Sequence, residues 1–432
     1  MRTALARGLA GAALLVLLAS AVPAADPPKL SLESVLALAD APHPDMDQAR
    51  ARAQVAEAES RLAASLDDFR LTLEGTLRTG RNEFYNDHFH PDHQARLLAR
   101  KNLYDGGLVE LGTGAARAEA EARSLQTLDV QAQRRLTLMA RYFDVLLAEM
   151  QYNADQEFLA VAYVDWDNNK DRLAQGQIAQ WKLSELEARY QDARAKRNDT
   201  LRKLREKRLQ LAHAMNRSES VAEELQDPPL ADNNRKLPDF DVLLRHAIAH
   251  NPALKAQDSL LVATQGRRDA ARSAYRPSVD FEAEAAYWKR ESSTRDDVRA
   301  GLNFVLPLWQ GDRVDANVAR EQARITEIMA QRDKAVMQLR ESMKAVWEEI
   351  QYLLDGERQR AQVNAQYRDI ALEKARAEYE MELKTNLGTS MAETQVAQIG
   401  RRATEYRLAL AWARLEALLG TPLADVNIKE AP

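Results

Sequence analysis

Hydrophobic and polar residues alternate with a period of two in four short stretches of the chain. The four stretches are residues 70–79, 94–104, 278–288 and 297–307. In the third, Asp280, Glu282 and Glu284 alternate with apolar residues only. Half-buried strands of a soluble sheet alternate in this way, and so do strands between lipid and a water-filled lumen. The size and charge of the polar side favour the second interpretation, and transmembrane strands have a matching length of about 9 to 11 residues.

Long stretches after the strands carry hydrophobic residues three or four positions apart. This spacing runs over residues 183–215 and 336–353, and it predicts coiled-coil helices. Proline is absent from residues 92–227 and 308–421, so connections that need turn residues are rare there. A helix over about residues 115–171 would span roughly 85 Å at 1.5 Å per residue. We therefore expect long helical hairpins.

The order of these elements recurs about 205 residues further along the chain. The turn at residues 103–106 has its counterpart at 308–311, and each half contains a broken helix, two strands and a helical hairpin. The predicted boundaries are a signal peptide at 1–24, a first repeat at 25–217, a linker at 218–236, a second repeat at 237–422 and a C-terminal tail at 423–432. The predicted fold is mainly α with a small β part, in two tandem structural repeats.

The first residues have the three parts of a secretory signal peptide. Arg2 and Arg7 supply the basic start, residues 8–19 the apolar core and residues 22–24 a small-residue cleavage site. This apolar run is shorter than the roughly 20 residues that span a membrane, so export is expected. The chain has no cysteine, which excludes a lipoprotein anchor, disulfides and thiolate metal sites.

The charge and the motifs of the chain exclude further classes of function. The chain has 60 Lys and Arg against 65 Asp and Glu, and it lacks the basic patch that nucleic-acid binding requires. No nucleophile motif, phosphate loop or metal-binding helix pair occurs, so we expect neither an enzyme nor a cofactor. His88, His90 and His93 form a weak metal candidate, since imidazole suits Zn, Cu or Ni. An exposed polar loop joining the first two strands accounts for these histidines as well.

Two strand-to-helix turns carry a resemblance to a known family. Residues 102–107 and 306–311 each combine a hydrophobe, an aromatic residue and one or two glycines. Glycine lets the chain swing from strand to helix where a β-carbon would clash. The turn positions are Gly106, Gly107, Pro307 and Gly311. Together with the repeat, these turns resemble those of the TolC-like outer membrane efflux proteins, and the resemblance covers residues 30–422.

The resemblance implies a homotrimer, in agreement with the fact that four strands cannot close a barrel. Each repeat would give two barrel strands and a coiled-coil hairpin to a trimeric 12-stranded outer membrane β-barrel that continues into a 12-helix periplasmic tunnel. The expected location is the outer membrane of a Gram-negative bacterium, in contact with lipid and extending into the periplasm. The expected partners are two further copies, a periplasmic adaptor (membrane fusion protein) and an inner-membrane pump.

The implied function is a duct in a tripartite efflux or type I secretion system, which passively conducts substrate from pump and adaptor to the exterior. A periplasmic coiled-coil tether or adaptor without a pore is the alternative, because it would share the helices and the signal peptide. Such a tether has no use for lipid-facing strands.

The resemblance places adaptor-docking tips at the ends of the two hairpins, near residue 176 and over residues 382–388. The tip residues are Arg172, Gly176, Ile178, Ala179, Glu382, Lys384, Thr385 and Leu387. The acidic entrance positions of the family fall here on Gly388 and Met391. Possible entrance charges are therefore Asp165, Asp171 and Glu393.

Overall fold

The computed structural model describes residues 29–82, 86–289, 296–381 and 387–426. The helices are α1 (Leu32–Leu36), α2 (Pro44–Ala64), α3 (Leu108–Ala174), α4 (Gln180–Ala214), α5 (Phe240–His250), α6 (Pro252–Ser273), α7 (Arg313–Tyr352), α8 (Arg358–Glu380) and α9 (Leu387–Leu419). The strands are β1 (Arg70–Thr76), β2 (Thr79–Asn82), β3 (Asn86–Pro91), β4 (His93–Tyr104), β5 (Ser278–Lys289) and β6 (Val298–Val305). The predicted signal peptide and the tip residues Glu382, Lys384 and Thr385 lie outside the described residues.

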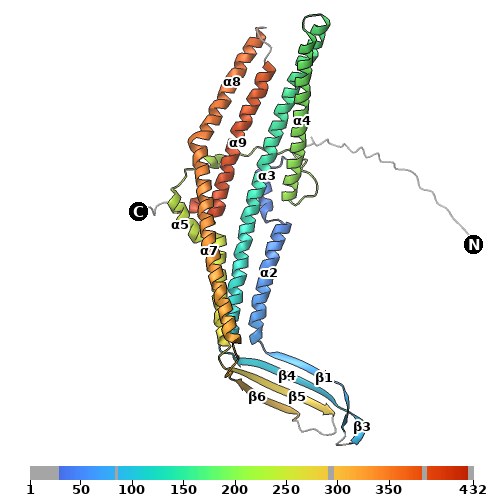
Figure 1. Ribbon diagram of the computed structural model, residues 1–432, viewed down its shortest axis with the longest axis vertical. Helices are drawn as coiled ribbons and strands as arrows, with labels where there is room; N and C mark the ends of the chain where they lie inside the picture. The colour runs from blue at the N-terminus through green and yellow to red at the C-terminus, as the bar shows by residue number, and fades with distance from the viewer. Residues whose placement is uncertain (1–28, 83–85, 290–295, 382–386, 427–432) are drawn as a thin grey trace, which may run out of the picture.

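The helices run along the length of the molecule, and the main sheet lies at one end (Figure 1). The α3 helix forms the spine, because it packs against α2, α4, α6 and α9. Two pairs of helices, α3 with α4 and α8 with α9, point away from the sheet (Figure 1). Within the described ranges, no helix is both long enough and apolar enough to cross a membrane.

The spine helix has 67 residues and begins earlier than the predicted residue 115. Asp105 explains the early start. Its carboxylate accepts hydrogen bonds from the backbone N–H of Gly107 at 2.9 Å and of Val109 at 2.7 Å. These bonds satisfy donors that a helix N-terminus otherwise leaves free.

The strands β1, β4, β5 and β6 form one antiparallel sheet in that order. The register aligns the apolar sides of the strands, with Leu73 opposite Leu97 and Phe281 opposite Leu302. The connection between the first two predicted strands differs from the simple loop that we expected. It contains β2 and β3, which pair with each other as a separate hairpin. An ion pair between Arg78 and Asp92 lies next to this hairpin.

Two clusters of buried apolar residues hold the helices together. One joins α5, α7 and α9 around Met343 and Trp412, both with 0% of their surface exposed. The other joins α3 and α4 around Tyr142 and Leu211. Fully burying such a side chain contributes roughly 1.5–3 kcal/mol to folding. These clusters position the two long hairpins relative to each other.

The segment predicted as a linker, residues 218–236, is packed into the second cluster. Val221 and Leu225 are buried, and Leu225 forms an isolated β-bridge with Leu30. The hydroxyl of Tyr142 donates to the carbonyl of Gln226 at 2.5 Å. Burial raises the pKa of Tyr142 to about 12. The segment is therefore an integral part of the body of the molecule.

The predicted C-terminal tail also begins inside the core. Leu423 and Val426 are buried in the first cluster, beside α9. Isolated apolar residues of this kind show no periodicity, so the sequence gives no sign of their packing.

Candidate functional site

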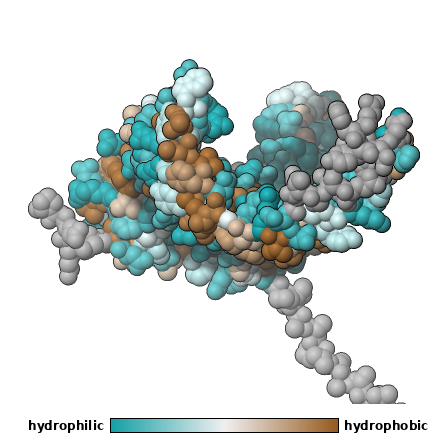
Figure 2. Space-filling model, turned by 90° about the horizontal axis from the view of Figure 1, so that it is seen from below, coloured by the Kyte–Doolittle hydropathy of each residue, from teal (hydrophilic) through white to brown (hydrophobic). Residues whose placement is uncertain are grey.

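One face of the sheet is apolar and exposed, and we call it the apolar face. Its residues are Leu71, Leu73, Leu97, Ala99, Phe281, Ala283, Val298, Leu302 and Phe304. Leu73 is 77% exposed and Leu302 67% exposed. A band of hydrophobic surface crosses the underside of the molecule, the end at which the sheet lies (Figure 2). Apolar patches of this extent mark contacts with a membrane or with another protein.

The opposite face, the polar face, carries four arginines and four carboxylates. They are Arg70, Glu74, Arg96, Arg100, Asp280, Glu282, Glu284 and Arg299. Ion pairs link every two neighbouring strands of the sheet. Arg96 lies 2.5 Å from Glu74, Arg100 lies 3.0 Å from Glu282, and Arg299 lies 2.5 Å from Glu284.

The predicted turn glycines lie where the sheet meets the helices. Gly106, Gly107 and Gly311 have φ values of +69°, +85° and +60°, a region that disfavours residues with a β-carbon. Gly106 is also crowded, because a β-carbon there would lie 2.4 Å from Cβ of Arg276. The guanidinium of Arg276 donates to the Gly106 carbonyl at 2.6 Å, which fixes the turn. Pro307 follows β6 in the second turn.

A cavity of about 700 Å³ opens on the polar face at this junction. Its lining includes Arg100, Asn102, Asp280, Glu282 and Asn303 from the strands. The amide of Asn102 donates to the carboxylate of Asp280 at 2.9 Å. The polar face thus contains a hollow, and hydrogen bonds join side chains that line it.

Gly176 lies in the turn between α3 and α4, with φ of +74°. Its N–H donates to the carbonyl of Leu173 at 2.9 Å, and the N–H of Gln177 donates to that of Arg172 at 2.8 Å. This pair of bonds is a Schellman motif, which satisfies the last carbonyls of α3. Arg172 and Ala179 are exposed and Ile178 is half-buried. No β-carbon contact constrains position 176, so the turn faces open space.

An aromatic group that was not predicted from the sequence lies below this tip. The rings of Trp166 and Tyr190 stack 5.1 Å apart, and Tyr163 packs against both. The ammonium of Lys170 lies 3.7 Å from the Trp166 ring centre, and its hydrogen bond to Asp167 raises its pKa. The three-residue spacing from Tyr163 to Trp166 is the only sequence signal for this group.

The second hairpin differs from the first. A π-helical turn, Leu353–Glu357, separates α7 from α8. The buried residues of α8 are Ala361, Ala365 and Ala375. Small residues in the seam between α8 and α9 leave less apolar area to stabilise this pair. Leu387 begins α9, and the tip residues before it lie outside the described residues.

Close contacts join the start of α9 to the spine. A β-carbon at Gly388 would lie 2.5 Å from a methyl carbon of Val161 on α3, so glycine is required by packing at this position. The amide of Gln395 also donates to the carboxylate of Glu157 on α3. Met391 is 38% exposed.

The possible entrance charges have different surroundings. Asp165 and Asp171 are exposed on α3 close to the first tip. Glu393 pairs with Arg368 of α8 at 2.5 Å. Its charge is therefore compensated within the second hairpin, whereas the two aspartates face solvent.

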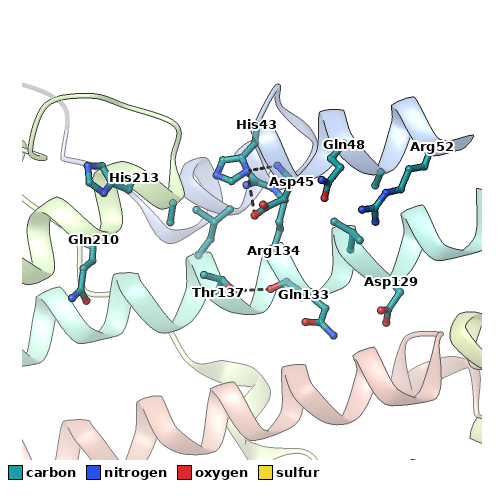
Figure 3. Close-up of a pocket in the computed structure, with 14 residues that line it drawn as sticks. His43, Asp45, Gln48, Arg52, Asp129, Gln133, Arg134, Thr137, Gln210 and His213 are labelled. Atoms are coloured by element: carbon teal, nitrogen blue, oxygen red, sulfur yellow. Dashed lines mark hydrogen bonds and ion pairs between the residues drawn. The ribbon is translucent and has the colours of Figure 1, made fainter. Parts of the chain in front are cut away.

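A second cavity, of about 620 Å³, lies between α2, α3 and α4 (Figure 3). Arg134 is buried there and donates to the carbonyls of Ala39 at 3.2 Å and Leu38 at 3.1 Å. Arg134 thereby supplies hydrogen-bond donors to carbonyls of the 3-10 turn Ala37–Asp40. Desolvation lowers the pKa of Arg134. Burial raises the pKa of Asp129 on the same wall. The buried Arg134 of this cavity therefore has a structural role, because it holds the 3-10 turn against α3.

The candidate metal histidines lie on the hairpin and the strand after it. His88 is exposed in β3, His93 begins β4, and the side chain of His90 lies outside the description. Among the side chains that the structure describes, no three His, Asp or Glu residues converge as metal ligands. Binding by all three histidines stays an untested prediction.

Comparison with known proteins gives a family match over part of the chain and a shared fold. Residues 243–421 match the model of the outer membrane efflux protein family. No curated protein matches the chain in sequence. Outer membrane efflux proteins are transport channels and not enzymes.

Solved outer membrane channels share the fold over nine-tenths of the chain. The open-state MtrE channel of Neisseria gonorrhoeae has a TM-score of 0.72 at 17% identity, covering 91% of this chain and 89% of its own. VceC of Vibrio cholerae has 0.70 at 18% identity, with 90% and 96% covered. CmeC of Campylobacter jejuni has 0.71 at 13% identity, with 90% and 85% covered. The match over residues 243–421 and the shared fold confirm the resemblance of this chain to the TolC-like outer membrane efflux proteins.

Proposed function

We propose that three copies of this chain form a duct through the outer membrane and the periplasm. The sheet would give four strands to a 12-stranded barrel, and the long helices would give four to a 12-helix tunnel. The apolar face would lie against lipid and the polar face against the lumen. The observation that carries this proposal is the contrast between the two faces, with 67% exposure at Leu302 on the apolar face and an ion pair between Arg299 and Glu284 on the polar face.

The edges of the sheet support assembly from several copies. Strands β1 and β6 are its outer strands, and within the described part of the chain each has one side without a partner strand. Open edges invite pairing with another chain, and closure into a barrel removes them. In the proposed trimer, β6 of one copy pairs with β1 of the next.

The two halves of the chain support the proposed tandem repeat. Each has a broken helix before its two main strands, α1 with α2 in the first half and α5 with α6 in the second. Each continues into long helices after a turn with glycine at positive φ, at Gly107 and Gly311. Cleavage of a signal peptide at residues 1–24 would export the chain to the outer membrane.

We further propose that the hairpin tips dock a periplasmic adaptor, which connects the duct to an inner-membrane pump. The open turn at Gly176 and the exposed Arg172 support this role for the first tip. The duct would conduct substrate passively.

Conductance tests the duct against the rival tether. Protein purified from outer membranes in mild detergent is reconstituted into planar lipid bilayers. A duct gives discrete conductance steps, and the protein stays in the membrane fraction when cells are broken without detergent. A tether extracts into the soluble periplasmic fraction and gives no steps, which would refute the proposal.

A further inference from the structure

The charges on the polar face of the sheet balance. Its arginines are Arg70, Arg96, Arg100 and Arg299, and its carboxylates are Glu74, Asp280, Glu282 and Glu284. All eight belong to the strand segments that would line the proposed lumen. The formal charge of this wall is therefore zero in each copy, and three copies leave it zero.

For three of the four carboxylates the balance is also local. Glu74 pairs with Arg96 at 2.5 Å, and Glu282 lies between Arg100 at 3.0 Å and Arg299 at 3.7 Å. Glu284, whose side chain is only 4% exposed, pairs with Arg299 at 2.5 Å. A buried carboxylate requires such a partner, because leaving its charge uncompensated is costly.

Paired charges act on a passing ion differently from single ones. Beyond the separation of the pair, the fields of the arginine and the carboxylate largely cancel, and salt screens the remainder over about 8 Å at physiological ionic strength. A ring of uncompensated charges of one sign selects ions by charge, as acidic rings do in cation channels. The polar face has no such ring.

We propose that the strand-lined part of the duct passes cations and anions without charge selection, because its four arginines balance its four carboxylates and three of these carboxylates pair directly with arginines of the same wall. The fourth carboxylate, Asp280, accepts a hydrogen bond from Asn102. Arg100 and Glu282 are the residues that hold this balance at the cavity where the strands meet the helices. This inference rests on the proposed duct. It names the ion pairs that leave this part of the duct without a charge filter.

The test measures the reversal potential of single channels in planar bilayers under a potassium chloride gradient. Arg100→Gln leaves three extra carboxylates per trimer and should raise the cation-to-anion permeability ratio at least about twofold at low salt, where screening is weak. Glu282→Gln should lower the ratio by a similar factor. The double variant should return to the wild-type value. Both side chains are partly exposed, at 62% and 36%, so the folded sheet tolerates these changes.

Lys101→Gln is the matched control, because Lys101 lies beside Arg100 in β4 and opposite Phe281 of the apolar face. It removes one positive charge and should leave the reversal potential unchanged. Equal reversal potentials for wild type, Arg100→Gln and Glu282→Gln would overturn the inference, and so would a double variant that differs from wild type. Absence of any conductance would instead refute the duct itself.

Discussion

The apolar face of the sheet and the helical core are built from the same kinds of residue but have opposite exposure. Leu73 and Leu302 of the sheet are 77% and 67% exposed, whereas Met343 and Trp412 of the core have no exposed surface. The core is buried by the chain itself. Among the residues that the structure describes, none covers the exposed leucines of the apolar face, so the stability of this face depends on the surrounding medium. Apolar content alone therefore does not locate a residue inside a fold.

The largest effect is expected in the core. Trp412→Ala should lower the free energy of unfolding by about 3–5 kcal/mol, because it removes a large side chain from a packed cluster. Urea unfolding followed by far-ultraviolet circular dichroism measures this change. Trp181→Ala is the control, since Trp181 is 69% exposed on α4, and it should change stability by less than about 0.5 kcal/mol. Equal losses for both would contradict the assigned core.

An arginine introduced on the apolar face should destabilise the protein because it would contact lipid. Phe304→Arg should cost about 2–4 kcal/mol in a bilayer if this face meets lipid near the midplane. Asn303→Arg, on the polar face opposite Asp280, should be tolerated. The measurement is unfolding from lipid vesicles, with heat modifiability as a second readout. Equal sensitivity at the two positions would refute the assignment of the two faces.

The joint between the two regions should show a smaller effect. Gly106→Ala combines positive φ with a β-carbon 2.4 Å from Arg276, and strained backbone costs roughly 1–3 kcal/mol. Gly112→Ala, in open space within α3, should instead stabilise by about 0.4–1 kcal/mol. Thermal unfolding distinguishes the two signs. A neutral Gly106→Ala would mean that this turn is not fixed by its glycine.

The smallest effect on stability is expected at the tip. A β-carbon at position 176 has no neighbouring atom within 4 Å, so we expect Gly176→Trp to cost about 1–2 kcal/mol, the cost of a left-handed residue. Trimers should still insert, but crosslinking to the adaptor and export should be lost. A bulky change at mid-helix Ala193 should harm packing and trimer yield instead. Normal export by Gly176→Trp would show that the tip is not the docking surface.

Periodicity explains why much of the fold could be predicted. The period-2 segments and the helical spacing locate β4, β5, β6, α4 and α7, because each exposes one face to a different environment along its length. The turn glycines were equally visible, since positive φ favours a single residue type. Local rules were sufficient for these elements.

Features that depend on distant partners could not be predicted. The packing of Val221 in the supposed linker depends on helices far away in sequence. The π-helical turn at Leu353–Glu357 begins at the last residue of the hydrophobic repeat over residues 336–353, and that repeat gives no sign of it. The ion pairs of the polar face depend on strand register, which brings Arg100 to Glu282 across 182 positions of sequence. The alternation showed these charges but not their pairing.

The mass of the folded species tests the central claim most directly, because an apolar face with open edges needs further copies as well as lipid. Native mass spectrometry of protein extracted from outer membranes in mild detergent measures it. The proposed duct predicts a species with three times the mass of the mature chain. A folded, stable monomer would contradict it.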